Sequence, residues 1–142
     1  MSTDPGQLHE LEVEARVEAP PEVVFSFFTE PEKYRLWKGQ EAELDARPGG
    51  IYRVTMDDVN VVRGEYVDVD PPHRVVFTWG FEGNEGHPPG TSQVEVTFTA
   101  DGHATIVRLR HTGLPDEEQR SAHAAGWPLY LTQLVEAAAR LG

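Results

Sequence analysis

Apolar and polar residues alternate with a period of two along most of this chain, and the last part changes to the period of a helix. In LEVEARVE, residues 11–18, the alternation is strict, which is typical of a half-buried antiparallel strand. Six further segments repeat it: EAELDA (41–46), IYRVTM (51–56), VVRGEYVDV (61–69), VVFTWGF (75–81), SQVEVTFT (92–99) and HATIVRLRH (103–111). We therefore expect seven antiparallel strands that share one apolar face.

Two short helices are expected between the first strand and the other six. Pro20 and Pro21 suit a helix start, because the first turn of a helix tolerates a missing N–H. Pro31 ends this helix and begins a second one, PEKYRLW at residues 31–37. Two short helices joined at a proline predict a V-shaped pair.

Residues 116–141 have the spacing of one long helix. One stripe of this helix gathers His123, Trp127, Leu131, Leu134, Ala138 and Leu141, with Tyr130 at its border. Gly126 and Pro128 interrupt the pattern. We interpret Gly126 as a close approach of helix and sheet, and Pro128 as a bend that aims Trp127 inward. A third breaker, Gly64, predicts a β-bulge at its own position in the strand over residues 61–69.

The order of these elements predicts an α+β fold in one domain that covers residues 1–142. A sheet with one apolar face must be covered, and the pattern offers one long helix to cover it. A sheet that curls around this helix, with the two short helices closing one end, buries every apolar face. Such an arrangement leaves either a cavity or a solid core between helix and sheet. The glycine-rich loop EGNEGHPPG (82–90) is expected at the mouth of the cavity or is a long hairpin connection.

Composition narrows the function classes. The chain has no cysteine, which excludes a disulfide scaffold, a thiolate metal site and a cysteine nucleophile. Its net charge of −12 argues against nucleic acid and anionic membranes as partners. No signal sequence or membrane-spanning run is recognisable, so a cytoplasmic protein is expected. The six histidines are not at metal-binding spacing, and no catalytic or cofactor-binding motif is found, so no metal, cofactor or catalytic residue is predicted.

The candidate ligand-binding residues are those that combine an inward position with an aromatic ring, an imidazole or a large apolar side chain. A cavity with apolar walls and a few polar tips is the usual form of a small-molecule site. These residues are Phe28, Trp37, Tyr52, Met56, Trp79, Phe81, His111, His123, Trp127, Tyr130 and Leu131. Each of the two histidines either orients a ligand, moves a proton or is a hydrogen-bonded core residue. We expect His123 to orient a ligand and His111 to belong to the core.

Four stretches of this sequence resemble a known family. They are VEAPPEVVFSFFTEPEKYRLW, GGIYRV, RGEYVDVDPPHRVVFTW and HTGLPDEEQRSAHAAGW, in that order along the chain. The chain is similar to the activator-of-heat-shock-ATPase homologue (Aha-type) family within the START-like, or SRPBCC, helix-grip superfamily. The resemblance implies a curved antiparallel sheet wrapped around the C-terminal helix, which lines one wall of a cavity.

The resemblance leaves three functions open. The favoured one is binding of a small apolar or aromatic molecule by a bacterial cytoplasmic protein, with a homodimer possible. The second is a protein–protein module that contacts a heat-shock chaperone in a stress response, although the family's eukaryotic namesake acts with an additional domain. The third is a cyclase or hydrolase that uses His111 or His123. On balance the sequence favours a protein that is not an enzyme.

Overall fold

The computed structural model describes residues 9–38 and 41–141. Within them the chain forms β1 (Leu11–Val17), α2 (Pro21–Ser26), α3 (Pro31–Tyr34), β2 (Glu41–Leu44), β3 (Ile51–Thr55), β4 (Val61–Asp70), β5 (Arg74–Trp79), β6 (Ser92–Asp101), β7 (Ala104–Thr112) and α4 (Glu117–Leu141). The second short helix ends at Tyr34, three residues before the predicted end. The order of the elements is the predicted one.

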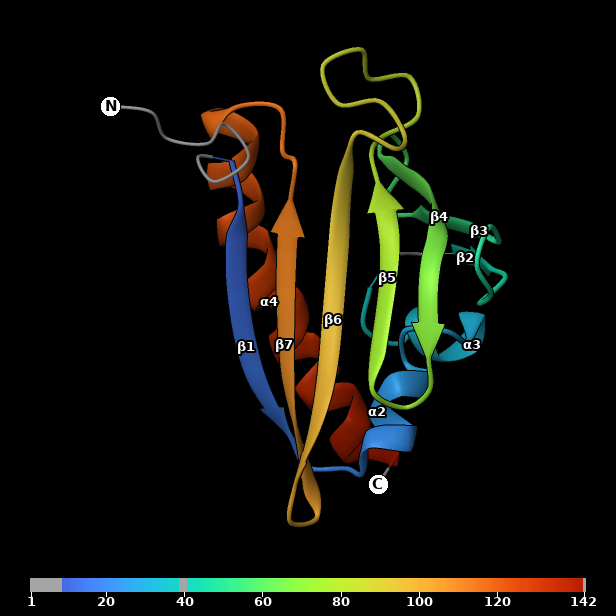
Figure 1. The fold of residues 1–142 in the computed structure, drawn as a ribbon, viewed down its shortest axis with the longest axis vertical. Coiled ribbons are helices and arrows are strands. Elements are labelled where there is room, and N and C mark those ends of the chain that lie inside the picture. Colours follow the sequence, from blue (N-terminus) through green and yellow to red (C-terminus); the bar gives the residue numbers. More distant parts are fainter. Residues whose placement is uncertain (1–8, 39–40, 142) are drawn as a thin grey trace.

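The seven strands belong to one sheet in the order β1-β7-β6-β5-β4-β3-β2, and every neighbouring pair is antiparallel. Figure 1 shows this sheet face-on, with α4 running behind β1, β7 and β6 and with α2 and α3 below and beside the other edge. The curved antiparallel sheet, the two short helices and the long C-terminal helix confirm the predicted fold class.

Alternate residues of the central strands face α4 and form the core. Those strand residues are Val75, Phe77 and Trp79 of β5, Val94, Val96 and Phe98 of β6, and Val107, Leu109 and His111 of β7, all nearly or fully buried. The helix contributes Trp127, Leu131, Leu134, Ala137 and Ala138, which confirms most of the predicted stripe. The side chain of Leu141, also in that stripe, lies outside the described residues.

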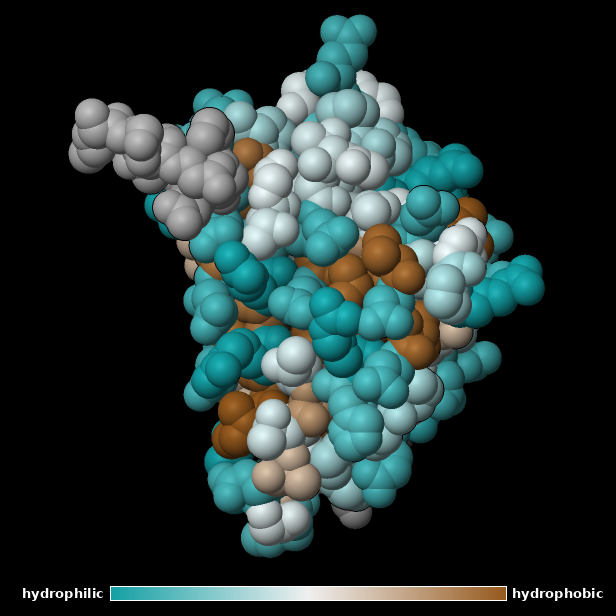
Figure 2. All heavy atoms as spheres, in the orientation of Figure 1, coloured by the Kyte–Doolittle hydropathy of each residue, from teal (hydrophilic) through white to brown (hydrophobic). Residues whose placement is uncertain are grey.

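The opposite face of the sheet carries paired charges. Arg108 lies opposite Glu14 in the β1–β7 register, and their side chains approach to 2.9 Å. Arg74 reaches Asp68 at 2.5 Å and Glu95 at 2.6 Å. Figure 2 shows this face as mostly hydrophilic with scattered hydrophobic side chains. Exposed ion pairs contribute about 0–1 kcal/mol each, so their main effect is to keep this face in water while the other face is buried.

The interpretations of Gly64 and Gly126 were wrong. The irregularity in β4 lies between Tyr66 and Asp68, whereas Gly64 pairs regularly with Tyr52. A Cβ at Gly64 would lie 2.0 Å from the backbone oxygen of Thr78, so this glycine permits a close approach of two strands. At Gly126 the opposite holds, because a Cβ there would meet nothing within 4 Å. The missing side chain of Gly126 leaves space beside α4.

Candidate functional site

A pocket of about 250 Å³ lies between α4 and the sheet. Its lining comprises Lys38, Met56, Asp57, Asn60, Val62, Trp79, Phe81, Ala122, His123, Gly126, Trp127 and Tyr130. Six of the residues expected from the sequence are therefore brought together here, namely Met56, Trp79, Phe81, His123, Trp127 and Tyr130. The structure does not place the other five in this lining.

The residue at which α4 begins determines which of its side chains form the helical wall of the pocket. The Asp116 side chain accepts a hydrogen bond from the backbone N–H of Gln119 at 2.8 Å, which caps the helix before Glu117. From that start, His123, Trp127 and Tyr130 fall on one face of the helix. The helix continues through Pro128, which is exposed to solvent. Trp127 is buried, as predicted.

The sheet wall of the pocket is built where strands end. Trp79 is the last residue of β5, and Phe81 follows it in an isolated bridge to Val62 of β4. The turn between β3 and β4 is fixed by Asp57, whose Oδ1 accepts the backbone N–H of Asn60 at 2.7 Å. The side-chain amide of Asn60 and the backbone N–H groups of Asn60 and Val59 all donate to this carboxylate and hold the pKa of Asp57 below its usual value, so it stays charged at the rim of the pocket.

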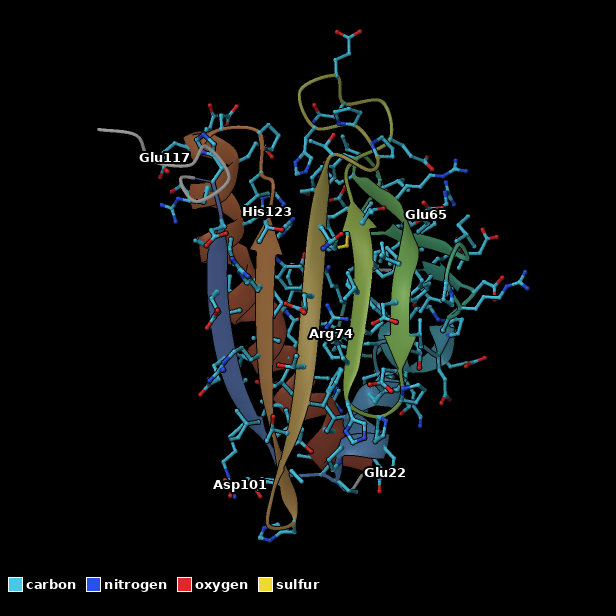
Figure 3. The ribbon with its side chains drawn as sticks, in the orientation of Figure 1. Glu22, Glu65, Arg74, Asp101, Glu117 and His123 are labelled. Carbon is cyan, nitrogen blue, oxygen red and sulfur yellow. The ribbon has the colours of Figure 1, made fainter. Side chains whose placement is uncertain are left out.

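The His123 side chain, on the helical wall of the pocket, hydrogen-bonds to Trp79 on the sheet wall. The indole N–H of Trp79 donates to Nε2 of His123 at 3.2 Å, so the ring hydrogen is on Nδ1, which donates to the backbone oxygen of Gln119 at 2.7 Å. Burial lowers the pKa of His123, which keeps the imidazole neutral. In Figure 3 the labelled His123 lies beside the upper end of β7, on the side of the sheet that α4 covers.

His111 lies behind the pocket rather than in its lining. The indole N–H of Trp127 donates to Nδ1 of His111 at 3.0 Å, and Nε2 of His111 donates to Oγ of Ser92 at 2.9 Å. The hydroxyl of Ser92 in turn donates to the backbone oxygen of Trp79 at 3.1 Å, and Nε2 of His87 lies 2.8 Å from the same Oγ. Burial holds the pKa of His111 well below its usual value. Both of its nitrogens are used inside the protein, as they are in His123, but the His111 ring is not part of the pocket lining, which is the position of a core histidine.

Lys38 is the one lysine in the lining. Its backbone N–H donates to the oxygen of Tyr34 at 3.0 Å, which continues the turn after α3 and directs the side chain inward. Its Nζ lies 3.8 Å from the ring centroid of Trp79 and 4.1 Å from that of Trp127. The residue is 2% exposed, and no hydrogen-bond partner of Nζ is found in the described part of the chain. Burial holds the pKa of Lys38 well below its usual value.

Four of the remaining expected residues lie in other packed regions. Phe28, Trp37 and Tyr52 form an aromatic cluster beside α2 and α3, in which Tyr52 stacks on Phe77 with ring centroids 4.1 Å apart. Leu131 borders a separate depression at the edge between α4 and β1. His111, the fifth, is the core residue described above.

Sequence reasoning did not include the lining residues Lys38, Asp57, Asn60, Val62 and Ala122, nor the pocket space at Gly126. Lys38 follows Tyr34, which the structure shows to be fully buried, by four residues, and its backbone continues the same turn, so the two side chains point the same way. A lysine at such a position contradicts the usual placement of charged side chains at the surface. The turn residues carried no comparable signal.

Comparison with known proteins then places the chain among its relatives. A family model described as "Activator of Hsp90 ATPase homolog 1-like protein" matches residues 18–139. The chain belongs to this family, within the START-like superfamily. The chain is 29% identical to the human "Activator of 90 kDa heat shock protein ATPase homolog 1" over 112 residues, which are 78% of this chain and 31% of that protein. It thus spans about a third of the length of this curated relative.

Two solved structures of the family resemble it along most of both chains. An AHSA1-like protein from Rhizobium etli is 42% identical, with a TM-score of 0.72, and the match covers 91% of this chain and 81% of that one. An HSP90 activator from Plasmodium falciparum is 25% identical, with a TM-score of 0.74, and the match covers 89% and 93%. The predicted family membership is confirmed.

No group of three or more histidine, aspartate or glutamate side chains among the described residues is arranged to hold a metal ion. No helix within the described ranges is both long and apolar enough to cross a membrane.

Proposed function

We propose that this protein binds a small, largely apolar molecule in the pocket between α4 and the sheet. The observation that carries the proposal is the convergence of Trp79, Trp127 and Tyr130 around a buried lysine whose amine has no partner among the described residues. Binding sites for small molecules are typically aromatic and apolar, with a few polar groups that fix orientation. A pocket of about 250 Å³ suits a ligand with one or two rings.

A fluorescence titration tests this function. Trp79 and Trp127 line the pocket, so an occupant changes the intrinsic tryptophan emission of the protein. We expect a saturable response to at least one member of a panel of apolar dyes, fatty acids, flavonoids and simple benzyl alcohols. Native mass spectrometry of freshly purified protein gives an independent readout, because it detects a retained ligand and the number of subunits. A flat response across the panel, with no retained mass, would contradict the proposal.

Family membership favours a second candidate, contact with an Hsp90-type chaperone. Its support is that the human relative and the Plasmodium falciparum structure are named as activators of Hsp90. Adding the purified chain to a chaperone ATPase assay distinguishes the two. Ligand binding with no change in ATPase rate favours the first function, and a dose-dependent stimulation without ligand binding favours the second.

The arrangement of the histidines gives less support to an enzyme. A general base needs a nitrogen lone pair that can reach the ligand. The acceptor nitrogens of His111 and His123 instead receive hydrogen bonds from the indole N–H groups of Trp127 and Trp79. We therefore propose that His123 orients a ligand indirectly, by holding the indole of Trp79 in the pocket wall, and that His111 has a packing role.

A further inference from the structure

The amine of Lys38 is the chemically unusual group in the pocket. The chain has two lysines, and the other, Lys33, donates to Oγ of Ser26 at 2.9 Å and lies 3.8 Å from the carboxylate of Glu30. The Nζ of Lys38 has neither an acceptor nor a carboxylate within these distances among the described residues, although it is 2% exposed and lines the pocket. Its immediate neighbours are ring faces.

Burial of this kind changes the state of an amine. An isolated buried charge is so costly that the group usually gives up its proton instead. The rings of Trp79 and Trp127 attract a cation and so partly offset this cost. Burial nonetheless holds the pKa of Lys38 well below its usual value. The neutral amine that results has a lone pair, and a lysine desolvated in an apolar pocket is an activated nucleophile.

The charges around the pocket indicate whether an anionic, a cationic or a neutral ligand fits beside Lys38. An anionic ligand would meet the charged carboxylate of Asp57 at the rim, and it would approach a chain whose net charge is −12. A cationic ligand would suit the aromatic rings, but the Lys38 side chain already occupies the space between them. A neutral electrophile meets neither obstacle.

We propose that the pocket takes an aromatic aldehyde or ketone and that the amine of Lys38 captures its carbonyl carbon as a reversible imine. The inference rests on the proposed ligand-binding function and names the class of ligand. A C–N bond forms as the nitrogen lone pair attacks the carbonyl carbon, and the resulting carbinolamine loses water. The carbonyl oxygen leaves with the two hydrogens of the amine, so no oxidant or reductant takes part. The ring of the ligand lies in the remaining pocket space, which Phe81, Gly126 and Tyr130 also line.

Reductive trapping tests this assignment on the intact chain. The protein is incubated at neutral pH with benzaldehyde and cyanoborohydride, which reduces an imine to a stable benzylamine. Intact mass then counts the benzyl groups, and peptide mapping locates them. We expect more label on Lys38 than on Lys33, because burial lowers the pKa of Lys38 and leaves more of its amine neutral. The α-amine of the chain also reacts near neutral pH, and the peptide map counts its label separately. The chain has no cysteine to compete for the aldehyde.

Two controls make the result specific. In urea the preference for Lys38 should vanish, because the pocket is gone. Lys38→Met keeps a side chain of similar size and should abolish the pocket adduct, whereas Lys33→Arg should leave it unchanged. Mapping of the unsubstituted chain already locates the adduct, so the test does not depend on whether Lys38→Met folds.

The outcomes separate this inference from the function on which it rests. Benzyl alcohol has the same ring without the electrophile, and its binding is followed by tryptophan fluorescence. If it binds and benzaldehyde leaves no preferential adduct on Lys38, the imine is overturned and the ligand-binding function stands. If benzoate binds more tightly than benzyl alcohol and no adduct forms, the amine is an anion anchor and the imine is again overturned. If nothing binds and nothing is trapped, both proposals fail.

Discussion

The indole N–H of Trp127 on α4 donates a hydrogen bond to Nδ1 of His111 on β7, with the two nitrogens 3.0 Å apart. This bond crosses the interface between helix and sheet at a place where both side chains are at most 2% exposed. It anchors the helical wall of the pocket without itself facing the pocket. This hydrogen bond assigns His111 to the interface between helix and sheet, whereas the sequence alone could not distinguish its role from that of His123 in the pocket.

His111→Ala should therefore lower stability and leave ligand affinity unchanged. The substitution leaves the indole N–H of Trp127 and the hydroxyl of Ser92 with a missing partner, at a cost of about 1–3 kcal/mol per unpaired group. Urea unfolding and a dye titration on the same sample measure both quantities. The matched control is His103→Ala, because that side chain is 86% exposed. A His111→Ala protein of normal stability but reduced affinity would show that this residue acts on the ligand.

His123→Ala should weaken ligand binding by about 1–3 kcal/mol, the range for unpairing a buried polar group. Its ring lines the pocket and accepts the N–H of Trp79, which would otherwise point unpaired towards the ligand. Dye affinity and melting temperature are measured together for this variant. An unaltered affinity with a lowered melting temperature would assign His123 to the core.

Gly126 offers a way to fill the pocket from the helix. Gly126→Ala should stabilise the protein by about 1 kcal/mol, since glycine is a poor helix former and a Cβ there meets nothing within 4 Å. Gly126→Leu should also fold but lose most of its ligand affinity, because the side chain enters the pocket space. Ala125→Leu, on the exposed neighbour, is the control. Equal affinities of the two leucine variants would place the ligand elsewhere.

The three histidines near the pocket predict a loss of stability in mild acid. Burial is the largest cause of the lowered pKa values of His87, His111 and His123. In the unfolded chain these side chains titrate near about 6.5. Below that pH the unfolded state binds more protons than the folded state, so this part of the unfolding free energy is complete above about pH 7 and falls as the pH drops through 6.5.

Urea unfolding across this range, above the pH at which carboxylates titrate, measures the effect. We expect the urea midpoint to fall steadily from about pH 7 to about pH 5. His111→Phe should reduce the slope. A midpoint that stays constant over this range would contradict the buried, neutral state of these side chains.

The sequence predicted the sheet well because its signal is periodic and redundant. A strand such as β6 buries every second residue along most of its length, so a single residue that departs from the alternation does not change the predicted strand. The roles of Gly64 and Gly126 were harder to predict, because a glycine gives the same sequence signal whether it allows a close contact or leaves a space. The contact at Gly64 involves Thr78, which the sequence pattern cannot place beside it.

The candidate site was predicted in part for a related reason. Inward position and an aromatic ring are shared by Trp79, Trp127 and Tyr130, but the same two properties describe Phe28 and Tyr52, which are not in the pocket lining. Whether an inward ring faces a space or another ring depends on the curvature of the sheet and the path of α4. Periodicity carries neither quantity. Lys38 was missed because polar residues were read as exposed.

The indole N–H signals of the three tryptophans give the most direct test that the pocket between α4 and the sheet is the binding site. Trp79 and Trp127 line it, whereas Trp37 is not in the lining and donates its N–H to the backbone oxygen of Phe27. In a two-dimensional ¹H–¹⁵N spectrum titrated with benzyl alcohol, we predict saturable shifts of the Trp79 and Trp127 signals and a stationary Trp37 signal. Shifts of Trp37 alone, or no shift of any of the three at saturating ligand, would contradict the account.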